Sequence, residues 1–110
     1  MNAVKQEVEK LVQKELESAN HRFPMFRSDH EGAAVIVEEI EEAEKELKEV
    51  RNGFCGLWNQ VKDNYKDSSN YDAKCICIDA INLACEAIQV AAMAQKFIDS
   101  QKEREKSEGN

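Results

Sequence analysis

Residues 73–98, AKCICIDAINLACEAIQVAAMAQKFI, decide the fold of this chain. The stretch is apolar on nearly every side of a helix, which predicts a helix at the centre of the assembly. Five polar residues share one stripe of that helix, at steps of three, four, three and seven: Asp79, Asn82, Glu86, Gln89 and Lys96. Buried polar groups need partners, because burying them unpaired is costly. The stripe is therefore either a ligand- or metal-facing line, or a hydrogen-bonded network or solvated groove of a helical bundle.

The composition predicts an all-α protein. Of the 110 residues, 42% are apolar and 34% are charged, and one Pro with four Gly leaves few of the tight turns that a small all-β domain needs. A chain this short buries a limited core, which oligomerisation commonly enlarges. We expect a four-helix-bundle-like fold with three long helices and one short helix, completed by oligomerisation.

The charge excludes one class of partner. The formal net charge is −7, from 22 acidic and 15 basic residues, so the field of the protein repels nucleic-acid phosphates. The first residues lead straight into a charged helix, which is not the pattern of a signal peptide. The weakly polar run Ala84–Ala94 is too short to span a bilayer. We therefore expect a cytoplasmic protein that binds neither nucleic acid nor membrane.

The four cysteines fit no zinc pattern. Cys75 and Cys77 form a CxC pair with no second pair after it, and on a helix the two side chains point about 200° apart. In a reducing cytosol we expect all four, with Cys55 and Cys85, to be small buried apolar side chains. A redox or metal role is the alternative.

The N-terminal part predicts one helix and an apolar connection. Helical spacing is shown over about residues 3–19 by Val4, Val8, Leu11, Val12, Glu15 and Leu16. Residues 20–26 break this pattern and contain Pro24, the only proline. Phe23, Met25 and Phe26 are unusually apolar for a connection, so we expect it to pack down, either over a site or at the end of a bundle.

Further helices follow. Ser28-Asp29-His30-Glu31 has the form of a capping box and predicts a helix to about Val50, ended by Asn52-Gly53. A short helix is expected over residues 54–65, then a polar turn over 66–70. The final helix should run from residue 71 or 72 to about 101, and residues 100–110 should fray.

Two of these helices carry carboxylate and amide groups at matched spacing. Glu39 and Glu42 are three residues apart, as are Glu86 and Gln89, so each pair lies on one helix face. Packed side by side, the two helices would aim several oxygens into one cleft, as a Mg²⁺ site requires. Clustered carboxylates repel one another unless cations neutralise them or some are protonated. Taken alone, the Glu-rich segment reads as a solvated helix face.

The two segments together resemble the MazG-like branch of the all-α NTP pyrophosphatases, especially small members from phages and prophages. Its EExxE motif is present as Glu38-Glu39-Ile40-Glu41-Glu42, and its ExxD motif corresponds to Glu86-Ala87-Ile88-Gln89. The resemblance covers roughly residues 23–98. It implies a MazG-type helical core over residues 23–99, between an N-terminal helix with its connection (1–22) and a polar tail (100–110).

The resemblance implies hydrolysis of a nucleoside triphosphate between its α and β phosphates, giving a monophosphate and pyrophosphate. The cofactor would be Mg²⁺, with Mn²⁺ as the alternative, and the working unit a homodimer or homotetramer. Glu39, Glu42 and Glu86 would be the catalytic metal ligands. Glu38 and Gln89 would complete the metal set. Asn82, Lys96 and Trp58 are the candidates for substrate binding: Lys96 for a phosphate, and Trp58 with Phe54 for the base, unless both aromatic residues pack in the core.

Two departures from the motif leave other functions open. Gln89 stands where the motif has Asp, which replaces a charged ligand by a neutral carbonyl oxygen and should weaken Mg²⁺ binding or change the number of ions. The separation between Glu42 and Glu86 is also longer than usual. One alternative is a non-catalytic relative that binds a nucleotide or a protein. The other is a purely structural helical oligomer.

Overall fold

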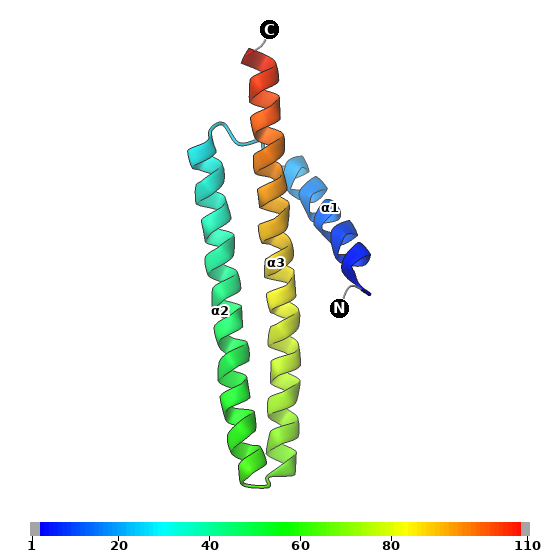
Figure 1. The fold of residues 1–110 in the computed structure, drawn as a ribbon, viewed down its shortest axis with the longest axis vertical. Helices are drawn as coiled ribbons and strands as arrows, with labels where there is room; N and C mark the ends of the chain where they lie inside the picture. The colour runs from blue at the N-terminus through cyan, green and yellow to red at the C-terminus, as the bar shows by residue number, and fades with distance from the viewer. Residues whose placement is uncertain (1–2, 109–110) are drawn as a thin grey trace. The chain divides into compact units, whose positions relative to one another are not determined.

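The computed structural model describes residues 3–108, and within them it contains three α-helices and no strand. Helix α1 spans Lys5–Arg22, α2 spans Asp29–Lys62 and α3 spans Lys66–Glu108 (Figure 1). The predicted all-α class is confirmed. The expected short fourth helix over residues 54–65 is not a separate element, because residues 54–62 belong to α2 and residues 63–65 lie between α2 and α3.

Helix α2 begins where the capping box predicts. The Glu31 N–H donates to the Ser28 hydroxyl oxygen at 3.1 Å, so Ser28 satisfies one of the unpaired donors of the first turn. Asp29 and Glu31 lie in that turn, where negative charge is favourable beside the positive end of the helix dipole.

The predicted end of this helix at Asn52-Gly53 is wrong, since α2 continues to Lys62. Gly53 does not adopt the positive φ that a glycine cap needs. Instead, a Cβ placed on Gly53 would lie 2.9 Å from Cγ1 of Ile76 on α3. The glycine therefore permits close approach of two helices, which the sequence alone does not distinguish from a helix end.

The chain reverses at residues 63–65, ahead of the predicted turn. Asn64 has a φ of 62°, the left-handed region that Asn tolerates better than most residues. Residues 66–70, predicted as a polar turn, form the first turn of α3. There the Ser69 hydroxyl donates to the Lys66 carbonyl oxygen at 2.9 Å, so the side chain of this serine is accommodated within the first helical turn.

The C-terminal part of α3 also differs from expectation. The helix extends to Glu108, and the fraying expected from residue 100 onward is not found over the described residues. Ser100 is only 1% exposed and Arg104 is partly buried. Tertiary contacts, not local propensity, therefore hold these polar turns in helix. The last two positions of the expected tail, 109 and 110, lie outside the described residues.

The helices contribute to two compact units. The core unit comprises Met1–Ile40 with Ala87–Asn110, and the hairpin unit comprises Glu41–Glu86. The buried apolar side chains all belong to the core unit: Leu16, Ala19, Phe26, Ala92 and Met93. The predicted central position of α3 is therefore confirmed for its core-unit part.

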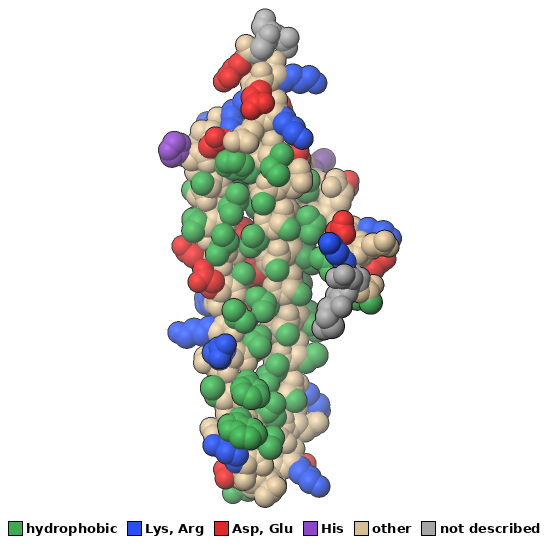
Figure 2. Space-filling view, viewed as in Figure 1, with side chains coloured by type: hydrophobic (Ala, Val, Ile, Leu, Met, Phe, Trp, Pro, Cys, Tyr) green, Lys and Arg blue, Asp and Glu red, His purple; other side chains and the backbone are tan. Residues whose placement is uncertain are grey.

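The hairpin unit has no core of its own. It consists of the antiparallel halves of α2 and α3, and none of its residues is buried. Large apolar side chains gather on its surface (Figure 2). Eight of them are about half exposed or more: Leu47, Phe54, Trp58, Val61, Tyr65, Tyr71, Ile78 and Ile81. Two helices bury only the stripes that face each other, so this unit presents an apolar face that the single chain does not cover.

Helix α3 is also the one described helix long and apolar enough to cross a membrane by length and composition. Its most apolar window of 18 residues has a mean hydropathy of 1.6. That is weak evidence for a membrane span, because the core helix of a soluble protein meets the same criterion.

Candidate functional site

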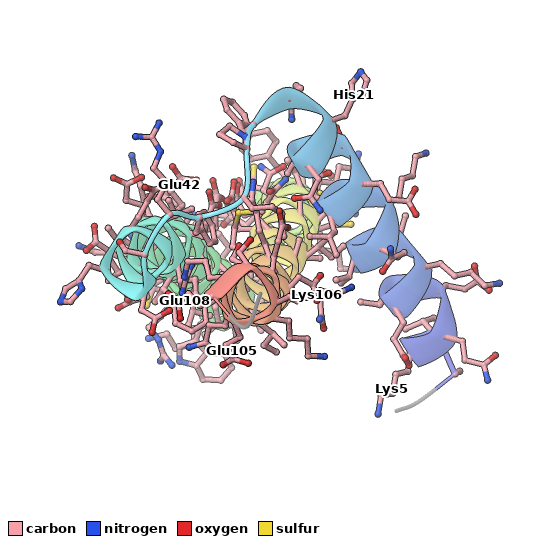
Figure 3. All side chains as sticks on the ribbon, turned by 90° about the horizontal axis from the view of Figure 1, so that it is seen from above. Lys5, His21, Glu42, Glu105, Lys106 and Glu108 are labelled. Atoms are coloured by element: carbon pink, nitrogen blue, oxygen red, sulfur yellow. The ribbon has the colours of Figure 1, made fainter. Side chains whose placement is uncertain are left out.

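The core unit encloses a pocket of about 440 Å³. Figure 3 labels Lys5 and His21 near the two ends of α1, where their side chains point into solvent. One side of α1 forms one pocket wall, and the start of α2, part of α3 and the connection between α1 and α2 form the others. The lining residues are Glu15, Ala19, Arg22, Phe23, Pro24, Phe26, Glu31, Val35, Glu39, Gln89, Met93 and Lys96. Carboxylates, cations and aromatic rings thus meet in one cavity.

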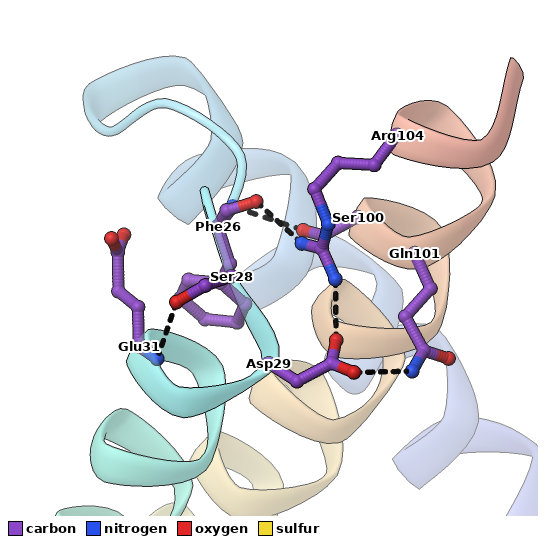
Figure 4. Close-up of polar contacts among 7 residues, drawn as sticks. All are labelled: Phe26, Ser28, Asp29, Glu31, Ser100, Gln101 and Arg104. Atoms are coloured by element: carbon purple, nitrogen blue, oxygen red, sulfur yellow. Dashed lines mark hydrogen bonds and ion pairs between the residues drawn. The ribbon is translucent and has the colours of Figure 1, made fainter. Parts of the chain in front are cut away.

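The connection over residues 23–28, which we call the strap, is fastened to α3 (Figure 4). The Phe26 N–H donates to the Ser100 hydroxyl oxygen at 3.0 Å, and Arg104 donates to the Phe26 carbonyl oxygen at 2.8 Å. Arg104 also forms an ion pair with Asp29, the first residue of α2. The prediction that this connection packs down is confirmed. Three strap residues line the pocket, so the strap covers the site.

Lys96 is the buried cation of the pocket. Its side chain is 2% exposed, and its ammonium lies 5.1 Å from the centroid of the Phe26 ring. Burial lowers the pKa of Lys96 from its ordinary value of 10.5, and the charge of Glu31 acts in the opposite direction. A buried ammonium is costly to maintain, and this one has the Phe26 ring and the charge of Glu31 as its surroundings.

We expect Lys96→Met to raise the free energy of unfolding at neutral pH by about 1 kcal/mol, because the thioether fills the space without a buried charge. Folding lowers the pKa of Lys96, so below 10.5 the folded wild type binds fewer protons than the unfolded chain. Wild-type stability therefore rises as pH increases toward 10.5, and the advantage of the variant shrinks. Urea denaturation at about pH 7 and about pH 10 measures both effects.

The exposed Lys102→Met, on the same helix, is the control and should change stability by less than about 0.5 kcal/mol. A Lys96→Met protein less stable than wild type at neutral pH would show that the ammonium stabilises the fold.

Gln89, the residue that departs from the motif, is held by a residue that sequence reasoning did not select. Its side-chain N–H donates to a carboxylate oxygen of Glu15 on α1 at 2.6 Å, across 74 residues of sequence. Both side chains are half-buried and line the pocket. One feature of the sequence could have identified Glu15. It stands among the apolar positions of the first helix, where a carboxylate needs a partner.

The carboxylates of the two motif segments approach each other at the end of the hairpin unit that is far from the turn at residues 63–65. A carboxylate oxygen of Glu42 on α2 lies within 4.8 Å of one of Glu86 on α3. Glu39 lies one turn before Glu42 on the same helix. Glu39 and Glu86 are half-buried and Glu42 is exposed. Glu38 is also exposed, and it is absent from the pocket lining.

These donors fit a hard cation. Mg²⁺ binds oxygens at about 2.0–2.1 Å, so two ligands of one ion lie roughly 3–4 Å apart. The Glu42 and Glu86 oxygens lie within 4.8 Å of each other, and an exposed carboxylate can rotate to reach that separation. The chemistry of the donor set therefore suits Mg²⁺ or Mn²⁺.

The other predicted substrate residues lie in the hairpin unit. Asn82 is exposed, and Trp58 is 51% exposed with the Lys62 ammonium 5.8 Å from its ring centroid. Neither lines the pocket of the core unit. Phe54 is 55% exposed, so core packing of the two aromatic residues is not found within the single chain.

The cysteines are free thiols, and the prediction that they are buried is wrong, because none of the four is buried. Cys55, Cys77 and Cys85 are exposed, and Cys75 is half-buried. All four lie in the hairpin unit, which has no buried residue. Their exposure therefore has the same cause as that of the large apolar side chains.

No family model matches the chain, and no curated protein or solved structure matches it significantly.

Proposed function

We propose that this protein is a Mg²⁺-dependent nucleoside triphosphate pyrophosphohydrolase of the MazG-like kind. It would cleave the bond between the α and β phosphates and release a monophosphate and pyrophosphate in the cytoplasm. One observation carries the proposal: Glu42 and Glu86, from the two motif segments, offer carboxylate oxygens within 4.8 Å of each other. The motif resemblance supplies the reaction, and this pair supports the metal that the reaction needs.

The metal ion, when bound, would neutralise phosphate charge and stabilise the charge that develops on the phosphoryl group. Glu42 and Glu86 would hold it, with Glu39 one turn away on α2. Their negative charge orients the site toward cations, and their oxygens match the ligand preference of Mg²⁺. These residues would therefore hold and position the ion, and the exposed carboxylate of Glu38 would act on it at longer range.

The pocket of the core unit would receive the substrate. Its volume of about 440 Å³ falls within the range of roughly 300–1,000 Å³ typical of small-molecule sites. Lys96 and Arg22 supply positive charge for phosphate oxygens, and Arg can bind them in a bidentate manner. Phe23 and Phe26 supply flat apolar surface, which a base can stack against.

A second copy of the chain would cover the apolar face of the hairpin unit and complete a four-helix bundle. On α2 the exposed side chains at positions 47, 54, 58 and 61 are spaced by seven, four and three, the pattern of a helix-packing seam. Eight half-exposed side chains offer on the order of 600–800 Å² to a partner. A standard interface buries about 800 Å² on each side.

We expect the double substitution Ile78→Asp with Ile81→Asp to convert a dimer into a monomer, because both side chains are 59% exposed on the apolar face. Burying two charges against a second copy would be unfavourable by several kcal/mol. Sedimentation equilibrium measures the change. The matched control is Val4→Asp, an exposed apolar residue of the core unit, which should leave the mass unchanged. A monomeric wild type would contradict the proposed assembly.

The test of the proposed activity is pyrophosphate release from a panel of ribo- and deoxyribonucleoside triphosphates, with Mg²⁺ or Mn²⁺ and with a chelator. Release that requires the metal would support the enzyme and identify the substrate class. Absence of metal-dependent turnover of every triphosphate would overturn it.

One observation favours a second candidate, a module that binds a nucleotide without cleaving it. Gln89 brings no charge to the motif, so the site has one carboxylate fewer than the family pattern. This candidate predicts that a triphosphate with Mg²⁺ raises the melting temperature while no pyrophosphate is released.

A further inference from the structure

We infer that the pocket of the core unit is selective for guanine nucleotides, and that Glu15 is the residue that selects the base. This rests on the proposed function for the class of ligand, a nucleotide, and adds the identity of the base. Glu15 and the residues that act with it all belong to the core unit and line the same pocket.

The polar side chains that α1 and α3 bring to the pocket lie at two levels. Glu15 on α1 accepts a hydrogen bond of 2.6 Å from the Gln89 amide on α3. Arg22 follows Glu15, and Lys96 follows Gln89, by seven residues, which is two helical turns or about 10 Å. Because α1 and α3 run in the same general direction (Figure 1), the pocket has acceptors toward one end and cations toward the other. A nucleotide has the same polarity, since its base and its phosphate lie at opposite ends.

The Glu15 carboxylate has capacity for further hydrogen bonds. Within the described residues its partner is a neutral amide, and that bond uses one acceptor position, whereas a carboxylate has about four. Glu15 is half-buried, so few waters reach these positions and N–H donors of a ligand would be favourable there. The bond to Gln89 also fixes the position of the carboxylate. This end of the pocket is therefore built to receive N–H groups.

Guanine matches this end better than the other common bases. Its N1–H and its N2 amino group are adjacent donors on one edge, and a carboxylate can accept both in a bidentate manner. Adenine and cytosine place a ring-nitrogen acceptor beside their amino group, and that acceptor would face the negative charge. Uracil and thymine have a single N–H between two carbonyl oxygens. A carboxylate at position 15 therefore favours guanine.

The strap supplies a surface for stacking. Phe23 lines the pocket and is 60% exposed, and the Arg22 guanidinium lies 5.9 Å from the centroid of its ring. Stacking on an aromatic ring stabilises any base, because every base has a flat face. Phe23 would therefore contribute affinity without distinguishing the bases, and the distinction falls to Glu15.

The test is mononucleotide binding to the full chain in the presence of a chelator, measured by isothermal titration calorimetry. Guanosine monophosphate should bind about 10-fold more tightly than inosine monophosphate, which lacks only the N2 amino group. Adenosine monophosphate should bind more weakly than either. Guanosine, which lacks the phosphate, should also bind more weakly, and Lys96→Met should narrow that difference without changing the preference for guanine over hypoxanthine.

Glu15→Gln is the decisive variant. It should weaken binding of guanosine monophosphate by about 10- to 100-fold, the range for losing hydrogen bonds to a charged group. It should also bring the affinities for the guanosine and inosine monophosphates within about threefold of each other. This ratio is measured on one protein sample, so partial unfolding of the variant does not change it. Glu9→Gln, at an exposed position of the same helix, is the control and should change each affinity by less than about twofold.

Equal affinities of the wild type for the three monophosphates, or no binding of any of them, would overturn the inference. An unchanged ratio in Glu15→Gln would also overturn it, because the base would then be selected elsewhere. Metal-dependent pyrophosphate release from any triphosphate would leave the proposed function in place in each case. Guanine selectivity that depends on Glu15, without pyrophosphate release, would support the inference and overturn the proposed reaction.

Discussion

Glu86→Gln is expected to reduce metal-dependent pyrophosphate release by at least about 100-fold. Glu86 is half-buried, and its carboxylate oxygen lies within 4.8 Å of one from Glu42. The substitution keeps the shape of the side chain and removes its charge, so the main change is weaker binding of the cation. Outer-shell partners of a metal already contribute about 10- to 100-fold, and a direct ligand should contribute more. The measurement is the rate of pyrophosphate release at saturating triphosphate across a Mg²⁺ titration.

Two matched substitutions distinguish the effect of losing a metal ligand from the effect of changing the net charge of the protein. Glu42→Gln should reproduce the loss, because Glu42 supplies the opposite oxygen of the pair. Glu103→Gln changes the same residue type at an exposed position of α3, and should retain activity within about twofold. If Glu86→Gln keeps wild-type activity at the Mg²⁺ concentrations that saturate the wild type, the acidic pair takes no part in the reaction.

Phe26→Ala is expected to lower the free energy of unfolding by about 3–5 kcal/mol. Phe26 is 6% exposed and belongs to the core cluster. Its ring lies against the helix at Gly32, where an added Cβ would be 2.9 Å from Phe26 Cδ2, so no side chain other than hydrogen fits between them. Truncation leaves a cavity that this backbone cannot close. For a small domain with a stability of roughly 5–15 kcal/mol, the loss is a large fraction.

Urea denaturation followed by circular dichroism measures this effect. Phe23→Ala changes the same residue type in the same strap, but Phe23 is 60% exposed, so its effect should stay within about 0.5 kcal/mol. Phe26→Leu should recover most of the stability, because it refills much of the volume. Equal effects of Phe23→Ala and Phe26→Ala would contradict a buried anchor at Phe26.

Local signals in the sequence predict the elements well where one physical cause acts alone. The capping box at Ser28 marks the start of α2 because its hydrogen bond involves neighbours in sequence. The signal at Gly53 fails because a glycine can either adopt a left-handed cap or admit a nearby helix. Only the contact with Ile76 distinguishes the two. The polar turns after Ser100 likewise depend on distant contacts to Phe26.

The candidate site likewise combines features that the sequence predicts with features that depend on distant contacts. Helical spacing places Gln89 and Lys96 on one stripe of α3, and both do line the pocket together with Glu39. Spacing within one helix does not reveal which other helix supplies a partner. Glu15 was therefore missed, since its bond to Gln89 joins residues 74 positions apart. The exposed Trp58 and Asn82 lie in the unit whose apolar face the single chain leaves uncovered.

The most direct test of the proposed function is ³¹P nuclear magnetic resonance of the full chain with a nucleoside triphosphate and Mg²⁺. The proposal predicts that the triphosphate signals disappear and that those of a monophosphate and pyrophosphate replace them, with no change when a chelator is present. A diphosphate with inorganic phosphate would place the cleavage at the wrong bond and contradict the proposed reaction. An unchanged triphosphate would contradict the enzyme altogether.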